Sequence, residues 1–194
     1  MFAIGAPYAS GDLMASLGAV EAEGSSYLAA IPAPEFFEPQ GAAWSPAEHV
    51  RHLAKSARPV ARAMGLPRIA LALRFGIHRG PSPPFADLRA RYLAQLAAGG
   101  TAGRFTPGPQ PRPDDPEAAR TAIIAQWLEA NGALRAALAA WDERALDRYR
   151  LPHPLLGLLT MREMMAFTAY HTAHHLRRVA ERRGAIPDRG GSGA

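Results

Sequence analysis

The sequence predicts an all-α protein, a bundle of four long helices with one long crossover between the second helix and the third. Apolar residues recur at helical spacing in four segments, and good N-cap residues begin most of them. No alternation of apolar and polar residues indicates a strand, and no internal repeat appears. Because neither flank of the crossover can bury its apolar face alone, we expect one domain over residues 1–194.

The first helix is predicted over residues 11–31. Asp12 is a plausible cap, and leucine and valine residues follow at helix-like spacing. Gly18 and Gly24 weaken the prediction of an uninterrupted helix, because glycine is a poor helix former. Two phenylalanines in the following loop are expected to pack over one end of the bundle.

The second helix is predicted over residues 45–64 and begins within the sequence WSPAEHVRHL. Ser45 takes the cap position, Pro46 the first helical position and Glu48 the third, which completes a capping box. Pro59 is expected to kink the helix or to end its regular part.

Residues 65–115 hold much of the proline and glycine and are interpreted as an irregular crossover, with one short helix near residues 86–98. Excursions of this length often shape a functional site. Asp115 or Asp114 then caps the third helix, which extends to about residue 141.

A connector over residues 142–159 leads into the fourth helix, residues 160–183, which the sequence delimits most clearly. Thr160 and Glu163 form a second capping box, and a glycine with a nearby proline ends the helix. The Gly-rich tail, residues 185–194, is expected to be flexible.

Composition excludes several classes of site. The chain has no cysteine, so disulfides, thiolate metal ligands and a cysteine nucleophile are excluded, and histidine and carboxylate are left as ligands. The net charge is +5, but the arginines are scattered and form no basic stripe, which argues against specific nucleic-acid binding. Without a signal segment or a long apolar run, we expect a cytoplasmic protein that does not enter a membrane.

The fourth helix carries His171 and His175 on its apolar face. Two histidines at positions i and i+4 point to the same side of a helix, a spacing that suits two bonds to one metal ion. His174 lies at the edge of this face and is interpreted as a bystander. The alternative is a pair of core histidines without a ligand.

A third ligand is expected from the second helix, which offers His49 and His52. Periodicity places His49 nearer the centre of the apolar face. Three neutral imidazoles would hold a divalent ion and leave positions open, as in catalytic sites. Zn²⁺ fits this donor set, and Ni²⁺ or Fe²⁺ are alternatives.

Two separated motifs resemble the DinB/YfiT-like superfamily of metalloenzymes: WSPAEHVRHLA at residues 44–54 and HPLLGLLTMREMMAFTAYHTAHHLRRV at residues 153–179. The resemblance covers most of the chain and implies an up-down-down-up bundle. It implies His52, rather than His49, as the ligand from the second helix, beside His171 and His175. It also implies a divalent metal, most readily Zn²⁺ or Ni²⁺, and a homodimer.

Other polar residues near these motifs have structural interpretations. His153 is expected to fix the turn before the fourth helix, Glu48 to act as a capping residue, and Tyr170 to pack beside the ligand pair. His78 lies in the crossover and is not assigned to the site.

The resemblance implies a metal-dependent enzyme, either a transferase that uses a low-molecular-weight thiol or a hydrolase. The sequence identifies no catalytic nucleophile or acid/base pair to choose between them. Arg68, Arg74 and Arg79 make the crossover cationic, a weak indication of an anionic cosubstrate. The alternative is a non-catalytic, stress-associated binding protein with a structural or vestigial metal site. A cavity that opens from the ion to solvent would favour the enzyme.

Overall fold

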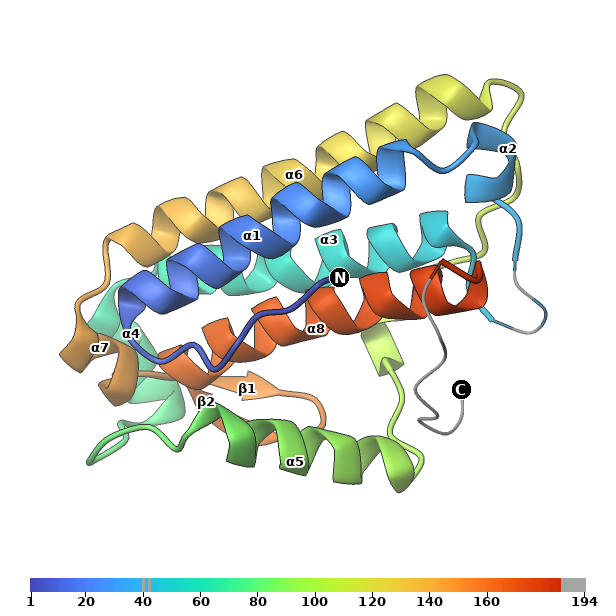
Figure 1. The fold of residues 1–194 in the computed structure, drawn as a ribbon. Coiled ribbons are helices and arrows are strands. Elements are labelled where there is room, and N and C mark those ends of the chain that lie inside the picture. Colours follow the sequence, from blue (N-terminus) through green and yellow to red (C-terminus); the bar gives the residue numbers. More distant parts are fainter. Residues whose placement is uncertain (40, 42, 186–194) are drawn as a thin grey trace.

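The computed structural model describes residues 1–39, 41 and 43–185, and most of these residues are helical. The all-α prediction is confirmed at this level. The four predicted long helices are all present (Figure 1): α1 (Ser10–Ala29), α3 (Pro46–Met64), α6 (Pro116–Ala139) and α8 (Met161–Arg182). The shorter elements are α2 (Ala33–Phe36), α4 (Arg68–Phe75), α5 (Phe85–Ala97), the 3₁₀ helix η1 (Gly103–Phe105), α7 (Glu143–Arg148), β1 (Arg150–His153) and β2 (Gly157–Thr160). The predicted tail lies outside the described residues from residue 186 onward.

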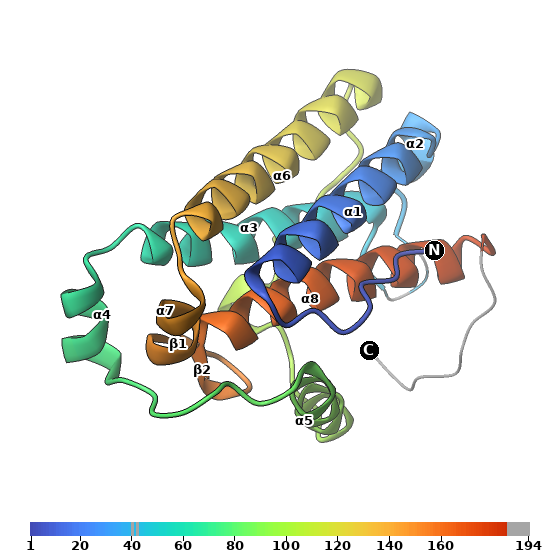
Figure 2. The same cartoon turned by 60° about the vertical axis from the view of Figure 1, so that its left-hand side comes forward.

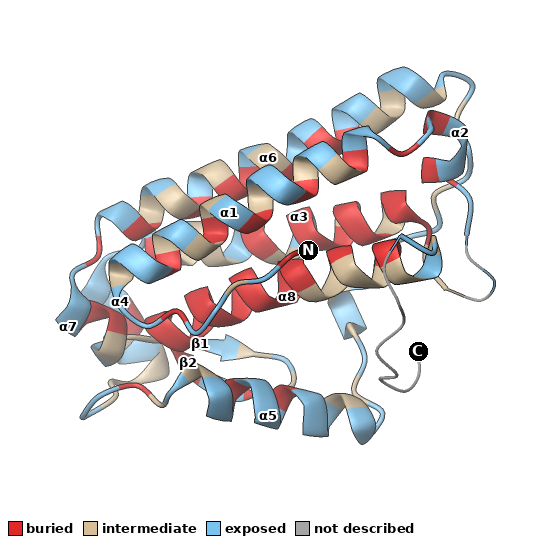
Figure 3. Ribbon diagram, viewed as in Figure 1, coloured by how far each residue is buried: buried red, intermediate tan, exposed pale blue. Residues whose placement is uncertain are grey.

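Helix α8 is the element on which the others pack. Its residues from Met161 to Ala173 are all buried (Figure 3), whereas a surface helix would expose one face. Helices α1, α3, α5 and α7 and both strands contact it. Polar threonine, glutamate, arginine and histidine side chains lie within this buried run and therefore need partners in the interior. Among the described residues, no helix combines the length and apolar character that a membrane span requires.

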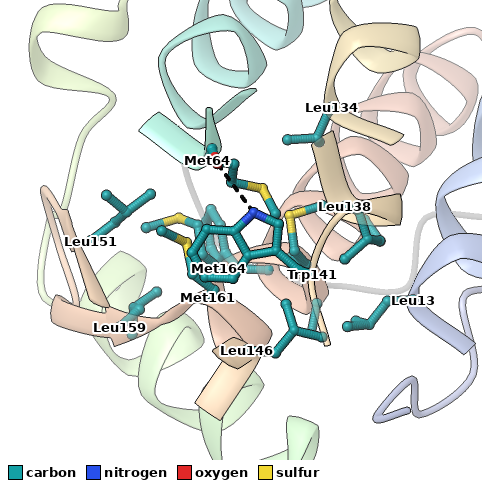
Figure 4. Close-up of a cluster of buried hydrophobic side chains, with 14 of the residues drawn as sticks. Leu13, Met64, Leu134, Leu138, Trp141, Leu146, Leu151, Leu159, Met161 and Met164 are labelled. Atoms are coloured by element: carbon teal, nitrogen blue, oxygen red, sulfur yellow. Dashed lines mark hydrogen bonds between the residues drawn. The ribbon is translucent and has the colours of Figure 1, made fainter. Parts of the chain in front are cut away.

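An apolar cluster fills the end of the molecule where α4 and α7 lie (Figure 4). Trp141, just after α6, donates its indole N–H to the carbonyl oxygen of Met64 at 3.1 Å. This bond satisfies the polar atom of a buried ring and joins the end of α3 to the end of α6. Other members of the cluster include Leu13, Leu134, Leu138, Leu146, Leu151, Leu159, Met161 and Met164. The opposite end is closed by Phe36 and Phe37, both buried as expected.

The segment predicted as a plain connector is more regular than expected. It holds α7 and an antiparallel hairpin in which β1 pairs with β2 and Leu151 lies opposite Leu159. The prediction of no strand was wrong because four-residue strands are too short to show a periodic pattern. Gly157 closes the hairpin turn with a φ of +74°, a conformation that L side chains rarely adopt.

The crossover also contains more helix than predicted. The short helix expected near residues 86–98 is confirmed as α5, which lies beside α8 and away from α6 (Figures 1 and 2). Leu88 and Tyr92 are its buried residues. Helix α4 was missed because Leu71 is its only buried residue, so no apolar stripe marks it in the sequence.

Side-chain contacts decide which residues cap α6 and α1. Asp115, not Asp114, caps α6 and accepts a backbone N–H through its carboxylate. Asp12 was wrongly assigned as the cap of α1. The helix begins two residues earlier, and Asp12 accepts the N–H of Ala9 at 3.1 Å from within the first turn.

Two glycines and one proline lie inside long helices without ending them. Helix α1 continues through Gly18 and Gly24, and α3 continues beyond the exposed Pro59. Gly24 has a packing role, because α1 approaches Trp127 of α6 and Leu176 of α8 at this point. A Cβ at position 24 would lie 2.6 Å from Leu176 Cδ1 and 2.9 Å from Trp127 Cη2.

We predict that Gly24→Ala lowers the free energy of unfolding by about 1–3 kcal/mol, because both neighbours are buried and cannot give way freely. This loss outweighs the higher helix propensity of alanine, which is worth about 1 kcal/mol. Gly18→Ala is the matched control, because a Cβ there meets only Arg135 Nη1 at 3.8 Å. It should raise the stability by up to about 1 kcal/mol. Urea unfolding measures both, and equal stabilisation by the two substitutions would contradict the close packing of α1.

Candidate metal centre

Two capping boxes fix the start of the helices that carry the histidines, as predicted. In α3 the Ser45 hydroxyl accepts the N–H of Glu48 at 3.2 Å, and the Glu48 carboxylate accepts the N–H of Ser45 at 2.8 Å. Thr160 and Glu163 make the same pair of bonds at the start of α8. The second Glu48 oxygen accepts the N–H of Gln110, which joins the crossover to α3. Glu48 is therefore a capping residue, as expected.

Three histidines from these two helices converge on one point. Nε2 of His52 lies 3.0 Å from Nε2 of His171, which lies 3.1 Å from Nε2 of His175. One ring nitrogen from each residue lies within 4.8 Å of the others. Imidazole nitrogens bind Zn²⁺ at about 2.0–2.1 Å, so nitrogens this close together can share one ion. The structure thus brings together the three residues that the family resemblance implies.

The surroundings keep these imidazoles neutral. Nδ1 of His52 lies 2.9 Å from the carbonyl oxygen of Phe105, which can only accept, so Nδ1 carries the proton and Nε2 keeps a lone pair. Burial lowers the pKa of His52, and it lowers the pKa of His171 and of His175 well below the usual value. Neutral imidazoles whose nitrogens face one another form a donor set that a shared cation stabilises.

His49 lies behind this group rather than within it. Its Nδ1 is 2.8 Å from Nδ1 of His175, so the two rings share a hydrogen bond on the side of His175 that faces away from the point of convergence. Burial, with smaller contributions from the charges of Arg182 and other neighbours, lowers the pKa of His49 to about 3. Periodicity correctly placed His49 on the inner face of α3, and its Nε2 has no partner among the described residues.

Aromatic rings enclose the histidines. Trp44 stacks on His175 with ring centroids 6.0 Å apart and an angle of 8° between the planes, and it also contacts the rings of His49 and His52. These contacts limit rotation of the imidazoles and exclude water from one side of the site.

The converging nitrogens lie on the wall of a cavity of about 710 Å³. The cavity lies between α3, which lines it from His49 as far as Leu66 just beyond the helix, and α8, which lines it from Met164 to Arg182. The crossover forms the outer wall, chiefly between Leu96 and Thr106. Small-molecule sites typically measure about 300–1,000 Å³, so the cavity has room for a substrate beside the histidines.

His153 fixes the turn before α8, as expected. Its Nδ1 accepts the backbone N–H groups of Leu155 and Leu156, both at 3.2 Å. Tyr170 is also confirmed as a packing residue, because it is buried between aromatic rings and does not line the cavity. His78 lies away from the cavity, and His174 lines it without joining the three converging nitrogens.

The crossover contributes two groups that sequence reasoning missed. The Phe105 carbonyl orients His52, and Tyr92 lines the cavity, with its pKa raised to about 12 by burial. A backbone carbonyl leaves no signal in a sequence, and the Pro/Gly-rich flanks of α5 hide which of its residues face inward. Of the crossover arginines singled out in the sequence, Arg74 lines the cavity, whereas Arg68 pairs with Asp142 at 3.4 Å.

We predict that His153→Asn reduces the loss of stability in acid. Burial lowers the pKa of His153 to about 4, compared with about 6.5 in an unfolded chain. The unfolded chain therefore binds more protons between these values. The contribution of the neutral imidazole is fully present above pH 6.5 and is lost as the pH falls through 4. An asparagine oxygen can still accept the two backbone N–H groups but does not titrate.

The measurement is urea unfolding in the presence of a chelator at pH 7 and at pH 4.5. Between pH 7 and pH 4.5, the free energy of unfolding should fall more in wild type than in His153→Asn. The difference should be on the order of 1–2 kcal/mol, because the ring is partly exposed. His153→Leu, which lacks the acceptor, should already be less stable at pH 7 by about 1 kcal/mol. Identical pH profiles for wild type and His153→Asn would show that the ring does not titrate in this range.

Comparison with known protein families supports the resemblance inferred from the two histidine-bearing motifs. A model of the DinB superfamily matches residues 17–179, a range that contains both histidine-bearing motifs and the crossover. Searches of curated proteins and of solved structures found no match to the chain. The family resemblance inferred from the sequence is confirmed, and the chain belongs to the DinB superfamily.

Proposed function

We propose that this protein is a divalent-metal-dependent enzyme in which His52, His171 and His175 hold Zn²⁺ or Ni²⁺. The observation that carries the proposal is the convergence of three Nε2 atoms on the wall of a cavity large enough for a small molecule. Such an ion supplies Lewis acidity, which lowers the pKa of a water or thiol that it coordinates.

Other groups of the chain prepare the site. The Phe105 carbonyl holds His52 in the tautomer whose Nε2 is free to bind, and the bond between His49 and His175 orients the latter ring. Trp44 and the ring of Phe167, which stacks on His171 at 5.3 Å, exclude water from the imidazoles. The chain thus supplies a pre-oriented set of neutral donors on the wall of the cavity.

A catalytic site is favoured over a structural one. Structural zinc sites are closed by four protein ligands. Among the described residues, the group whose ligand atoms converge contains His52, His171 and His175 and not His49, whose Nδ1 contacts the far side of His175. Three protein ligands beside a cavity leave room for a substrate, which the non-catalytic alternative does not require.

Among reactions of this type, transfer of a thiol is our first choice and hydrolysis the second. No aspartate or glutamate lies among the described residues that line the cavity. A hydrolase would gain from a carboxylate base that activates water, whereas a thiol bound to a metal ion loses its proton without one. A screen with cysteine as the probe thiol and chlorodinitrobenzene as the acceptor tests transfer directly, since it should need metal and His171.

We also propose the up-down-down-up arrangement of the four long helices that the family resemblance implies. In Figure 1, α1 and α8 begin at the end of the molecule where α7 lies, and α3 and α6 end there. This arrangement requires a long crossover between α3 and α6, which is where the cavity wall is built.

We predict that protein purified without a histidine tag binds one Zn²⁺ or Ni²⁺ per chain. Elemental analysis should find the ion in wild type and not in His52→Ala or His171→Ala, because each loses a ligand. His49→Ala should still bind one metal ion per chain, but its affinity for the ion should fall about 10–100-fold, because His49 orients the ligand His175. His78→Ala is the matched control and should behave as wild type, because His78 does not line the cavity.

Two results would contradict this assignment. Absence of metal from wild type, even after incubation with Zn²⁺ and Ni²⁺, would refute the metal site. If His52→Ala keeps the metal ion and His49→Ala loses it, the ligand from α3 is His49 and not His52.

A further inference from the structure

We propose that the cavity binds an elongated amphipathic anion, with its charged head at the three histidines and its apolar chain along α3. The placement of the head rests on the proposed function, since it assumes that the reactive group lies at the metal ion. The apolar channel and its charge are independent of that assumption.

The cavity is long in one direction. Its α3 wall begins at His49 and reaches Ala63 and then Leu66. At 1.5 Å per residue, Ala63 lies about 16 Å along the helix axis from His52. The α8 wall extends over a similar stretch, from Arg182 back to Met164. On α8, however, His171 lies about 10 Å along the axis from Met164 and about 16 Å from Arg182. The histidines therefore divide the cavity into a channel that extends toward Met164 and Ala63 and a part that extends toward Arg182. A compact substrate at the ion would leave the channel unfilled.

The channel beyond the histidines is mostly apolar, with Ser56, Tyr92 and His153 as polar members of its wall and Arg74 beside Phe75. Thr168 adds little polarity there, because its hydroxyl already donates to the Met164 carbonyl at 2.8 Å. A flexible hydrocarbon chain is the chemistry that such a wall recognises, since each buried methylene contributes through the hydrophobic effect. The apolar side chains that line this part are Leu53, Ala57, Val60, Ala63, Leu66, Phe75, Leu96, Leu151, Leu155, Met164 and Phe167.

The charge of the cavity is of one sign. Arg74, Arg104, Arg178 and Arg182 line it, and no acidic residue among the described ones does. Arg74, Arg104 and Arg182 form no ion pair with an acidic side chain within the described part of the chain. These three side chains are exposed, so solvent screens part of their charge, but no acidic side chain of the described residues is paired with them, and their potential attracts an anion.

Most of this charge lies near the histidines or beyond them along α8, on the side away from the apolar channel. Arg178 and Arg182 follow His175 within two turns of α8, and Arg104 directly precedes Phe105, whose carbonyl holds His52. The combination selects the ligand. A small hydrophilic thiol would use only the surroundings of the histidines, and an amphipathic cation would be repelled there. A neutral chain would leave the charges of Arg104 and Arg182 without an anionic counterpart.

The test is calorimetry of metal-loaded and metal-free protein with four probes kept below their micelle concentrations. Decanoate should bind one molecule per chain. Butyrate, which has the same head, and decyltrimethylammonium, which has a chain of the same length, should each bind at least ten-fold more weakly. The affinity for decanol should lie between the affinities for decanoate and for decyltrimethylammonium. Equal affinity for decanoate and butyrate, or for decanoate and the cation, would overturn the proposal.

Substitutions locate the bound probe. Ala63→Phe should block the channel and lower the affinity for decanoate at least ten-fold, while butyrate and Zn²⁺ bind as in wild type. Ala90→Phe is the matched control, because Ala90 is exposed on α5 and does not line the cavity. If Ala63→Phe fails to fold, Leu66→Trp serves as a second block, because Leu66 is 49% exposed and tolerates a larger ring. Decanoate affinity unchanged in the folded variant would refute the channel.

The head group is tested separately. Arg182→Gln and Arg104→Gln should each lower the affinity for decanoate about three- to ten-fold. The affinity for decanol should stay unchanged. If decanoate binds in this pattern to a protein that never binds metal, the channel stands and the proposed enzyme does not. If the protein binds one Zn²⁺ per chain but no decanoate, the channel is refuted and the metal site stands.

Discussion

The structure depends on the burial of a polar helix. Helix α8 is covered on nearly every side, yet its buried run includes His171, Thr168 and Glu163. A buried polar group destabilises the fold unless it has a partner. Glu163 is satisfied by the capping box and Thr168 by a backbone carbonyl. His171 is different, because its Nε2 meets ring nitrogens of the buried His52 and the partly buried His175, and a cation satisfies such a cluster better than a proton shared among neutral rings.

The crossover completes the site as well as the fold. Three contacts hold its second half against α3: Arg51 donates to the Gly108 carbonyl, Lys55 to the Thr106 carbonyl, and Gln110 to Glu48. These contacts place the Phe105 carbonyl beside His52 and make the crossover the outer wall of the cavity. The segment least regular in the sequence thus forms the outer wall of the cavity between the two helices.

The parts of the fold and site that the sequence predicted are those governed by local chemistry. Capping boxes and apolar periodicity identified the four long helices, and the i,i+4 spacing identified His171 and His175. Periodicity favoured His49 over His52, but both are buried on α3, and the approach of α8 decides which of them meets His171. The hairpin, the Phe105 carbonyl and the inward position of Tyr92 depend on contacts between segments far apart in the chain, which no local pattern encodes.

The central claim is that one residue of α3 and two of α8 share a single ion. X-ray absorption at the metal edge tests it most directly, on wild type and on His52→Ala reconstituted with the same ion. The account predicts three imidazole nitrogens at about 2.0–2.1 Å in wild type, and outer-shell scattering from two rings in the variant if any ion is retained. Ligation dominated by carboxylate oxygen, or a spectrum that does not change when His52 is removed, would contradict it.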